Sequence, residues 1–103
     1  MGNKILFIDD ERTPCFLCDI VRNTSEAVEL VKSGDYSVLY LDHDLGENES
    51  IRGFCLFLEE SFFNGEFYGI EKIVLHTQNP VGRKWMRDAF LRYVEVVDGF
   101  IAS

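Results

Sequence analysis

Ionisable residues directly follow three short apolar stretches of this sequence. They are Asp9 and Asp10 after residues 5–8, Asp42, His43 and Asp44 after residues 38–41, and His76 after residues 73–75. If the stretches are strands of one parallel sheet, these side chains meet at its carboxyl edge, where open α/β sheets bind ligands. Four carboxylates and two imidazoles at that edge predict a metal-assisted site for phosphate chemistry.

The carboxylates have the chemistry of a magnesium site. Mg²⁺ (or Mn²⁺) takes hard oxygen ligands in octahedral geometry and keeps several waters, so two or three carboxylates are enough. The predicted ligands are Asp9, Asp10 and Asp42. Aspartate also begins loops after strands, which is the alternative explanation for a single Asp pair. Two such clusters on neighbouring central strands favour the metal site.

The chain has two histidines, His43 and His76, and both follow predicted strands. Imidazole titrates near neutral pH, which suits general acid–base catalysis on an oxygen leaving group. Hydrolysis of a phosphate ester requires an activated water and a proton donor for the leaving oxygen, and two imidazoles can divide these roles. We therefore predict that both are catalytic. The alternative is that each is a hydrogen-bonded polar residue at a strand end.

Other polar residues are candidates for holding the phosphate. Arg12 and Arg83 are predicted to bind its oxygens, because a planar guanidinium binds oxyanions through two parallel hydrogen bonds. A solvated surface arginine is an equal alternative for Arg83. Asn79 is predicted to cap a helix, and since a helix N-terminus is itself an anion site, capping and phosphate binding can coexist. Asp44 is either a hydrogen-bond partner of a histidine or a turn residue.

The cysteines and the tryptophan are not predicted to carry out the chemistry. Cys15 and Cys18 have the spacing of a redox motif, but the chain has no second pair to complete a zinc site, and we predict that they pack in a loop. Cys55 falls on the apolar stripe of a helix and is predicted to lie in the core. Trp85 can either stack on a nucleobase or pack at the rim of the core.

Alternating strands and helices are predicted to position these residues. Apolar runs predict strands, the capping pair Asn23 and Glu26 predicts a helix that ends at Gly34, and Pro14 favours a loop over residues 11–18. The expected strands are residues 4–8, 19–22, 36–41, 71–75 and 94–97. Three helices are expected: the first follows Asn23, the second begins near Ile51, and the third begins at Asn79–Pro80. This alternation predicts right-handed crossovers and a parallel sheet.

Length and charge restrict the functional classes. The length of 103 residues suits one domain over residues 1–103. The sequence has no apolar run long enough to span a membrane and no leader at the N-terminus, so we expect a cytoplasmic protein. The net charge of −8 argues against an extended nucleic-acid surface, which requires Lys and Arg. It is compatible with action on a phosphate at one end of a nucleic acid, because a bound cation reverses the local charge.

The arrangement of Asp9-Asp10 and Asp42 resembles the receiver domain of response regulators. The resemblance implies a five-stranded parallel doubly wound α/β sheet of the flavodoxin-like order 2-1-3-4-5. It also implies that Asp42 accepts a phosphoryl group and that the acidic pair holds magnesium. Three features depart from ordinary receivers: a loop replaces the first helix, His76-Thr77 follows the fourth strand, and no Lys follows the fifth.

Three motifs resemble a narrower family, the receiver-like domains that process cyclic phosphates and are linked to RNA repair. They are Asp9-Asp10-Glu11-Arg12-x-Pro14, Asp42-His43-Asp44-Leu45-Gly46 and His76-x-x-Asn79-Pro80-x-Gly82-Arg83. The resemblance implies a metal-dependent phosphoesterase whose partner is a phosphorylated small molecule or an RNA terminus, with Asp42 as a possible covalent nucleophile. The alternatives are a phosphoacceptor or degenerate receiver module and an acidic protein-binding domain.

Overall fold

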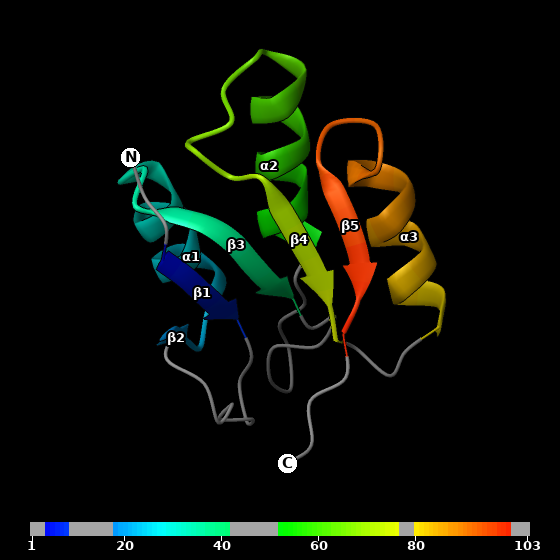
Figure 1. Cartoon of the computed structure of the whole chain (residues 1–103), viewed down its shortest axis with the longest axis horizontal. Helices are drawn as coiled ribbons and strands as arrows, with labels where there is room; N and C mark the ends of the chain where they lie inside the picture. The colour runs from blue at the N-terminus through cyan, green and yellow to red at the C-terminus, as the bar shows by residue number, and fades with distance from the viewer. Residues whose placement is uncertain (1–3, 9–17, 42–51, 77–79, 100–103) are drawn as a thin grey trace.

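A computed structural model describes residues 4–8, 18–41, 52–76 and 80–99 of the chain. The elements are β1 (Lys4–Ile8), β2 (Asp19–Val21), α1 (Thr24–Lys32), β3 (Tyr36–Leu41), α2 (Arg52–Phe63), β4 (Lys72–Leu75), α3 (Pro80–Phe90) and β5 (Glu95–Asp98). The five strands form one parallel sheet in the order β2-β1-β3-β4-β5, as predicted (Figure 1). The order reverses between β1 and β3, which is the switch point of this fold.

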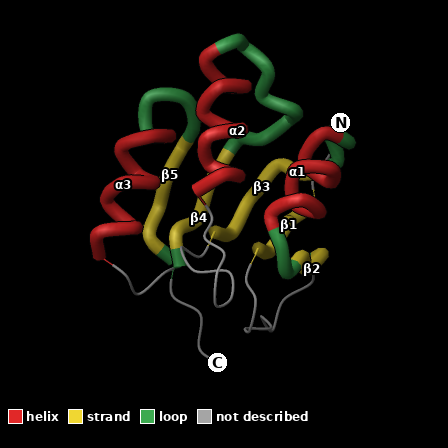
Figure 2. Tube along the Cα trace, turned by 180° about the vertical axis from the view of Figure 1, so that it is seen from behind, coloured by secondary structure: helices red, strands yellow, loops and turns green. Residues whose placement is uncertain are grey.

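The three helices of the described residues lie on one face of the sheet. Figure 1 shows the sheet in front of the helices, and Figure 2 shows the helices in front of the sheet. The core between these layers includes Leu6, Leu39 and Ile73 from the strands, together with Phe54 and Phe90 from the helices. Burial of these large side chains is the main favourable contribution to folding.

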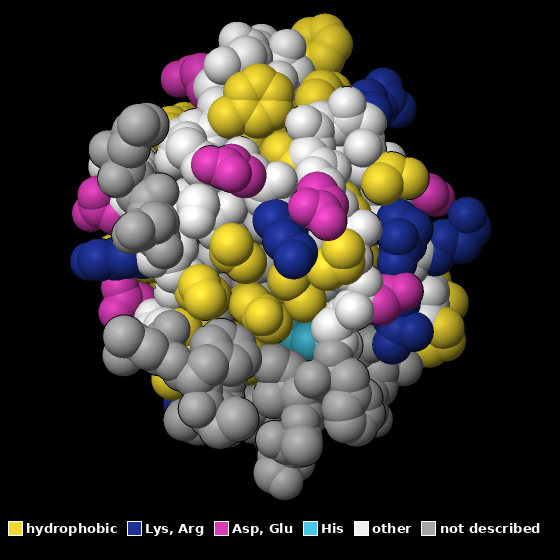
Figure 3. Space-filling model, viewed as in Figure 1, with side chains coloured by type: hydrophobic (Ala, Val, Ile, Leu, Met, Phe, Trp, Pro, Cys, Tyr) yellow, Lys and Arg dark blue, Asp and Glu magenta, His cyan; other side chains and the backbone are white. Residues whose placement is uncertain are grey.

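The opposite face of the sheet carries a continuous apolar row. The register aligns one residue from each strand, and these are Ile20, Phe7, Tyr40, Val74 and Val97. Phe7 and Val74 are buried, and the others are partly exposed. Figure 3 shows hydrophobic side chains gathered over the strands on this face, next to acidic and basic ones. Apolar side chains on both faces explain why the strand sequences do not alternate.

Local signals in the sequence fix the helix ends. Asn23 caps α1, since its Oδ1 accepts a hydrogen bond from the Glu26 backbone N–H at 2.9 Å and its Nδ2 donates to Glu26 Oε1 at 2.7 Å. Gly34, with φ of 80°, follows α1 at the predicted stop. After α2, Gly65 has φ of 84°, and the Glu66 backbone N–H donates to the Ser61 carbonyl at 2.8 Å, which is a Schellman ending.

Three strands differ by one residue from the sequence prediction: β2 ends at Val21 rather than at residue 22, β4 begins at Lys72 rather than at residue 71, and β5 is shifted along the chain. β5 spans Glu95–Asp98 rather than residues 94–97, because its register with β4 pairs Asp98 with Leu75. The element order β1, β2, α1 agrees with the predicted loss of the first helix. The predicted loop over residues 11–18 lies almost entirely within residues 9–17, outside the described part of the chain.

Candidate functional site

The strand ends are aligned at the carboxyl edge of the sheet. Ile8, Leu41 and Leu75, the last residues of β1, β3 and β4, are partners in the parallel register. The arrowheads of these strands point to the same edge in Figure 1. The residues that follow them in the sequence are Asp9, Asp42 and His76. The common edge predicted for the three strand-end clusters is therefore present in the sheet.

His76 lies one residue beyond β4, and its backbone N–H donates to the Leu41 carbonyl at 3.1 Å. The residue is 3% exposed. Its ring stacks on Phe7 with the centroids 4.7 Å apart and the planes 17° apart, and Tyr40 lies beside it with a centroid distance of 6.2 Å. Aromatic packing from β1 and β3 thus fixes the plane of the imidazole at the strand ends.

Arg83, in the first turns of α3, lies beside the end of β5. Its Nε is 3.9 Å from Asp98 Oδ1, and the same oxygen is 2.6 Å from Nη2 of Arg87. The two arginines are four residues apart and therefore share a face of α3. Sequence reasoning proposed Arg83 but missed Arg87 and Asp98. The i, i+4 spacing of the arginines was the available signal, whereas the acidic partner follows from the packing of α3 against β5.

Gly99 follows Asp98 at the same edge, and its backbone N–H donates to the Leu75 carbonyl at 2.7 Å. A Cβ placed on Gly99 would overlap Cγ1 of Val74. The backbone can approach β4 this closely because the residue has no side chain. This is the region in which ordinary receivers, by the resemblance above, carry a Lys.

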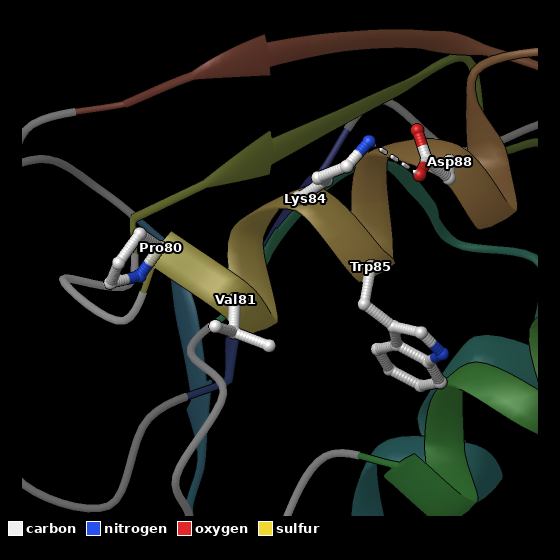
Figure 4. Close-up of a pocket in the computed structure, with 5 residues that line it drawn as sticks. All are labelled: Pro80, Val81, Lys84, Trp85 and Asp88. Carbon is white, nitrogen blue, oxygen red and sulfur yellow. Dashed lines mark hydrogen bonds and ion pairs between the residues drawn. The ribbon is translucent and has the colours of Figure 1, made fainter.

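Trp85 packs at the rim of the core, and the Arg52 guanidinium lies 5.0 Å from its ring centre. One face of α3 forms a shallow pocket of about 400 Å³ lined by Pro80, Val81, Lys84, Trp85 and Asp88. Figure 4 shows the indole directed toward α2, with Lys84 and Asp88 joined by an ion pair of 3.2 Å. The core-rim alternative for Trp85 therefore describes its packing, whereas Val81, which lines the same pocket, is exposed.

The described cysteines lack the properties of reactive thiols. Burial raises the pKa of the Cys55 thiol, with a further contribution from Glu59. Burial and then the charge of Asp19 raise the pKa of Cys18. A raised pKa keeps a thiol protonated and unreactive. Cys55 is 1% exposed and lies in the core, as predicted.

The predicted site residues that lie outside the described part of the chain are Asp9, Asp10, Arg12, Asp42, His43, Asp44 and Asn79. Within residues 4–8, 18–41, 52–76 and 80–99, no three His, Cys, Asp or Glu side chains form a group that could hold a metal ion. The structure therefore describes His76 and Arg83 from the predicted set, one beyond β4 and the other beside the end of β5.

A comparison with models of known protein families shows to which family the chain belongs. The family model described as the cyclic-phosphate processing receiver domain matches residues 4–92. The chain belongs to this family. The match spans all of the predicted site residues, from Asp9 to Arg83, and it ends before β5 begins. Asp98 therefore lies beyond the segment that defines the family membership.

Neither the curated proteins nor the solved structures compared with the chain gave a match. The fold class is supported by the family and by the strand order together, since both indicate a receiver-like α/β sheet. None of the described helices has both the length and the hydropathy needed to cross a bilayer.

Proposed function

We propose that this member of the cyclic-phosphate processing receiver family is a metal-dependent phosphoesterase. Its substrate would be a 2′,3′-cyclic phosphate at an RNA end or in a nucleotide. The observation that carries the proposal is the register that aligns the ends of β1, β3 and β4 in one row. Asp9, Asp42 and His76 are the next residues in the sequence. Carboxylates and an imidazole thus follow three neighbouring strands at the edge where this fold binds ligands.

Asp9, Asp10 and Asp42 would hold Mg²⁺ or Mn²⁺. Their hard oxygen donors and the alignment of the strands that precede two of them support this assignment. When bound, the ion supplies positive charge to the phosphate oxygens. Direct attack by Asp42 on phosphorus is a variant of the same proposal.

His43 and His76 would move the protons. In the hydrolysis, a water oxygen forms a bond to phosphorus and the bond from phosphorus to one ribose oxygen breaks. One imidazole accepts the proton of the water, and the other donates a proton to the leaving ribose oxygen. The stacking of His76 on Phe7 supports this role, because a catalytic ring must keep a constant orientation. Asp44 would orient one of the histidines.

Arg12, Arg83 and Asn79 would bind the non-bridging oxygens of the phosphate. Support for Arg83 comes from its contact with Asp98 at the end of β5. Asp98 pairs in the register with Leu75, and Leu75 directly precedes His76. A guanidinium at this edge would balance negative charge that develops on phosphorus oxygens in the transition state.

The activity test uses a nucleoside 2′,3′-cyclic phosphate with Mg²⁺ or Mn²⁺. His76→Phe retains an aromatic ring against Phe7 but has no ionisable group, and we expect it to lower kcat by roughly 10²- to 10⁴-fold. Asp42→Asn should also lose activity, whereas Asp88→Asn on the exposed side of α3 should retain it. Turnover that is absent from the wild type, or equal in the wild type, His76→Phe and Asp42→Asn, would contradict the proposal.

The alternative function is a phosphoacceptor or non-catalytic receiver module. Asp98 and Gly99 at the end of β5 count against it, because receivers use a Lys in this region to hold the phosphoryl oxygen. Incubation with a small phosphoryl donor followed by intact mass measurement distinguishes the two functions. A stable phosphoryl adduct on Asp42, without turnover of a cyclic phosphate, would favour the module.

A further inference from the structure

Asp98 makes the contacts that link the end of β5 to α3. Its Oδ1 is 2.6 Å from Nη2 of Arg87, the length of a strong charge-assisted hydrogen bond, and 3.9 Å from Nε of Arg83. The Arg83 and Arg87 side chains are about one third exposed and Asp98 is about half exposed. Arg87 therefore holds the carboxylate, and the carboxylate meets Arg83 on its Nε side.

The register of the sheet fixes where this cluster lies. Asp98 pairs with Leu75, and the following backbone N–H, that of Gly99, donates to the Leu75 carbonyl. In the other four strands the aligned positions are apolar, namely Val21, Ile8, Leu41 and Leu75. Asp98 is thus the one charged member of a row whose other four residues face the helix-side core. It lies on the strand next to Leu75, the residue that directly precedes His76.

The cluster is an exposed group of ion pairs in which two guanidinium groups contact the same carboxylate oxygen. An exposed ion pair contributes little to stability, because water screens it and ordering long side chains costs entropy. Holding an arginine in a fixed direction is a separate effect that such a pair can have without adding stability.

We propose that Asp98 is a positioning residue for Arg83. Anchored by Arg87, its carboxylate directs the Arg83 guanidinium toward an anionic group at the carboxyl edge of the sheet. The identity of that anion as a cyclic phosphate rests on the proposed function, whereas the ordering of Arg83 by Asp98 does not.

The first test measures the order of Arg83 in the free protein. The Nε–Hε resonance of Arg83, assigned by its loss in Arg83→Lys, is recorded by NMR for the wild type, Asp98→Asn and Asp88→Asn. Asp88 is a matched control because it is also an acidic residue paired with a cation, Lys84, on α3. We expect Asp98→Asn to shift and broaden the resonance and Asp88→Asn to leave it unchanged. An unchanged resonance in Asp98→Asn overturns the proposal.

The second test measures anion affinity with 2′,3′-cyclic AMP and, separately, inorganic phosphate, both in the presence of Mg²⁺. Removing a carboxylate makes the protein less negative, so unspecific electrostatics predict tighter anion binding in both Asn variants. Positioning predicts the opposite for Asp98→Asn: the affinity for the anion falls about tenfold. This is the change expected when the anion loses one charge-assisted hydrogen bond from Arg83. Equal or tighter binding of both probes by Asp98→Asn overturns the proposal.

A charge-neutral double variant separates direction from charge. Arg87→Gln combined with Asp98→Asn keeps the net charge of the wild type, and we expect the affinity loss and the altered Arg83 resonance to persist. Recovery of both to wild-type values would show that charge balance, and not positioning, controls binding, and would overturn the proposal. If the wild type binds inorganic phosphate but no cyclic nucleotide, the proposed function fails while the Arg83 resonance and the phosphate titration still decide the role of Asp98.

Discussion

Gly99 shows how closely a single residue at the carboxyl edge determines the packing there. Its backbone lies against β4, with the Leu75 carbonyl accepting its N–H and the Val74 side chain occupying the space of a Cβ. Val74 is buried and β-branched, so its methyl groups have few other rotamers. Gly99 directly follows Asp98, so its packing against β4 also fixes the backbone next to the carboxylate that contacts Arg83.

We predict that Gly99→Ala destabilises the protein by about 1–3 kcal/mol, the usual cost of adding a methyl group to a close-packed position. Urea unfolding followed by circular dichroism measures the change. Val74→Ala removes the methyl group that the new Cβ would overlap, so the double variant should lose less stability than the sum of the two single variants. Strict additivity of the two changes would show that the overlap with Val74 is not the cause.

The edge strand β2 is attached to the sheet by more than its three-residue pairing with β1. The Tyr36 hydroxyl, at the start of β3, donates to Asp19 Oδ2 at 2.6 Å and so connects the two strands that flank β1. Burial raises the pKa of Tyr36 to about 12 from 10.0, with further contributions from the hydrogen bond to Asp19 and from the charges of Asp19 and Asp35.

This shift predicts how the attachment of β2 depends on pH. The folded protein holds the Tyr36 proton more tightly than the unfolded chain, so the stabilisation is complete below pH 10 and is lost as the pH rises from 10 to about 12. The free energy of unfolding, measured by urea titration across this range, should fall less steeply in Tyr36→Phe than in the wild type. Asp19→Asn should give an intermediate slope, because burial remains the larger cause. Identical slopes in the wild type and Tyr36→Phe would contradict the prediction.

Elements with local signals were predictable from the sequence, and contacts between distant elements were not. The capping pair Asn23 and Glu26 and the stop at Gly34 gave the ends of α1, because caps depend on residues only a few positions apart. The pairing of Asp98 with Leu75 shifted β5 by one residue, and it depends on a register that no local pattern encodes. The stacking of His76 on Phe7 likewise joins residues from β1 and the end of β4.

The candidate site shows the same division at the scale of the whole molecule. The parallel order of the strands followed from their alternation with helices, and it brought the ends of β1, β3 and β4 to one edge as predicted. Which arginines share a carboxylate at that edge depended on how α3 packs beside β5. The strand ends that meet at this edge were therefore predictable from the sequence, whereas the contacts of Arg83 with other elements required the three-dimensional arrangement.

Net charge and metal binding affect the stability of the whole molecule in ways that can be separated. A net charge of −8 means that any salt screens self-repulsion and stabilises the fold to some extent. A cation bound by Asp9, Asp10 and Asp42 would add a specific stabilisation that grows with the logarithm of its concentration. We therefore predict that MgCl₂ or MnCl₂ raises the midpoint of thermal unfolding above the value in NaCl of equal ionic strength.

Two variants test whether this additional stabilisation comes from the carboxyl edge of the sheet. Asp42→Asn removes one of the proposed ligands and should unfold at the same temperature in MgCl₂ as in NaCl of equal ionic strength. Asp88→Asn removes the same charge from the exposed side of α3 and should keep the difference between the two salts. Because both variants change the net charge equally, a difference between them can come only from the location of the lost carboxylate. Equal midpoints of the wild type in the two salts would contradict the metal site itself, independently of any catalytic activity.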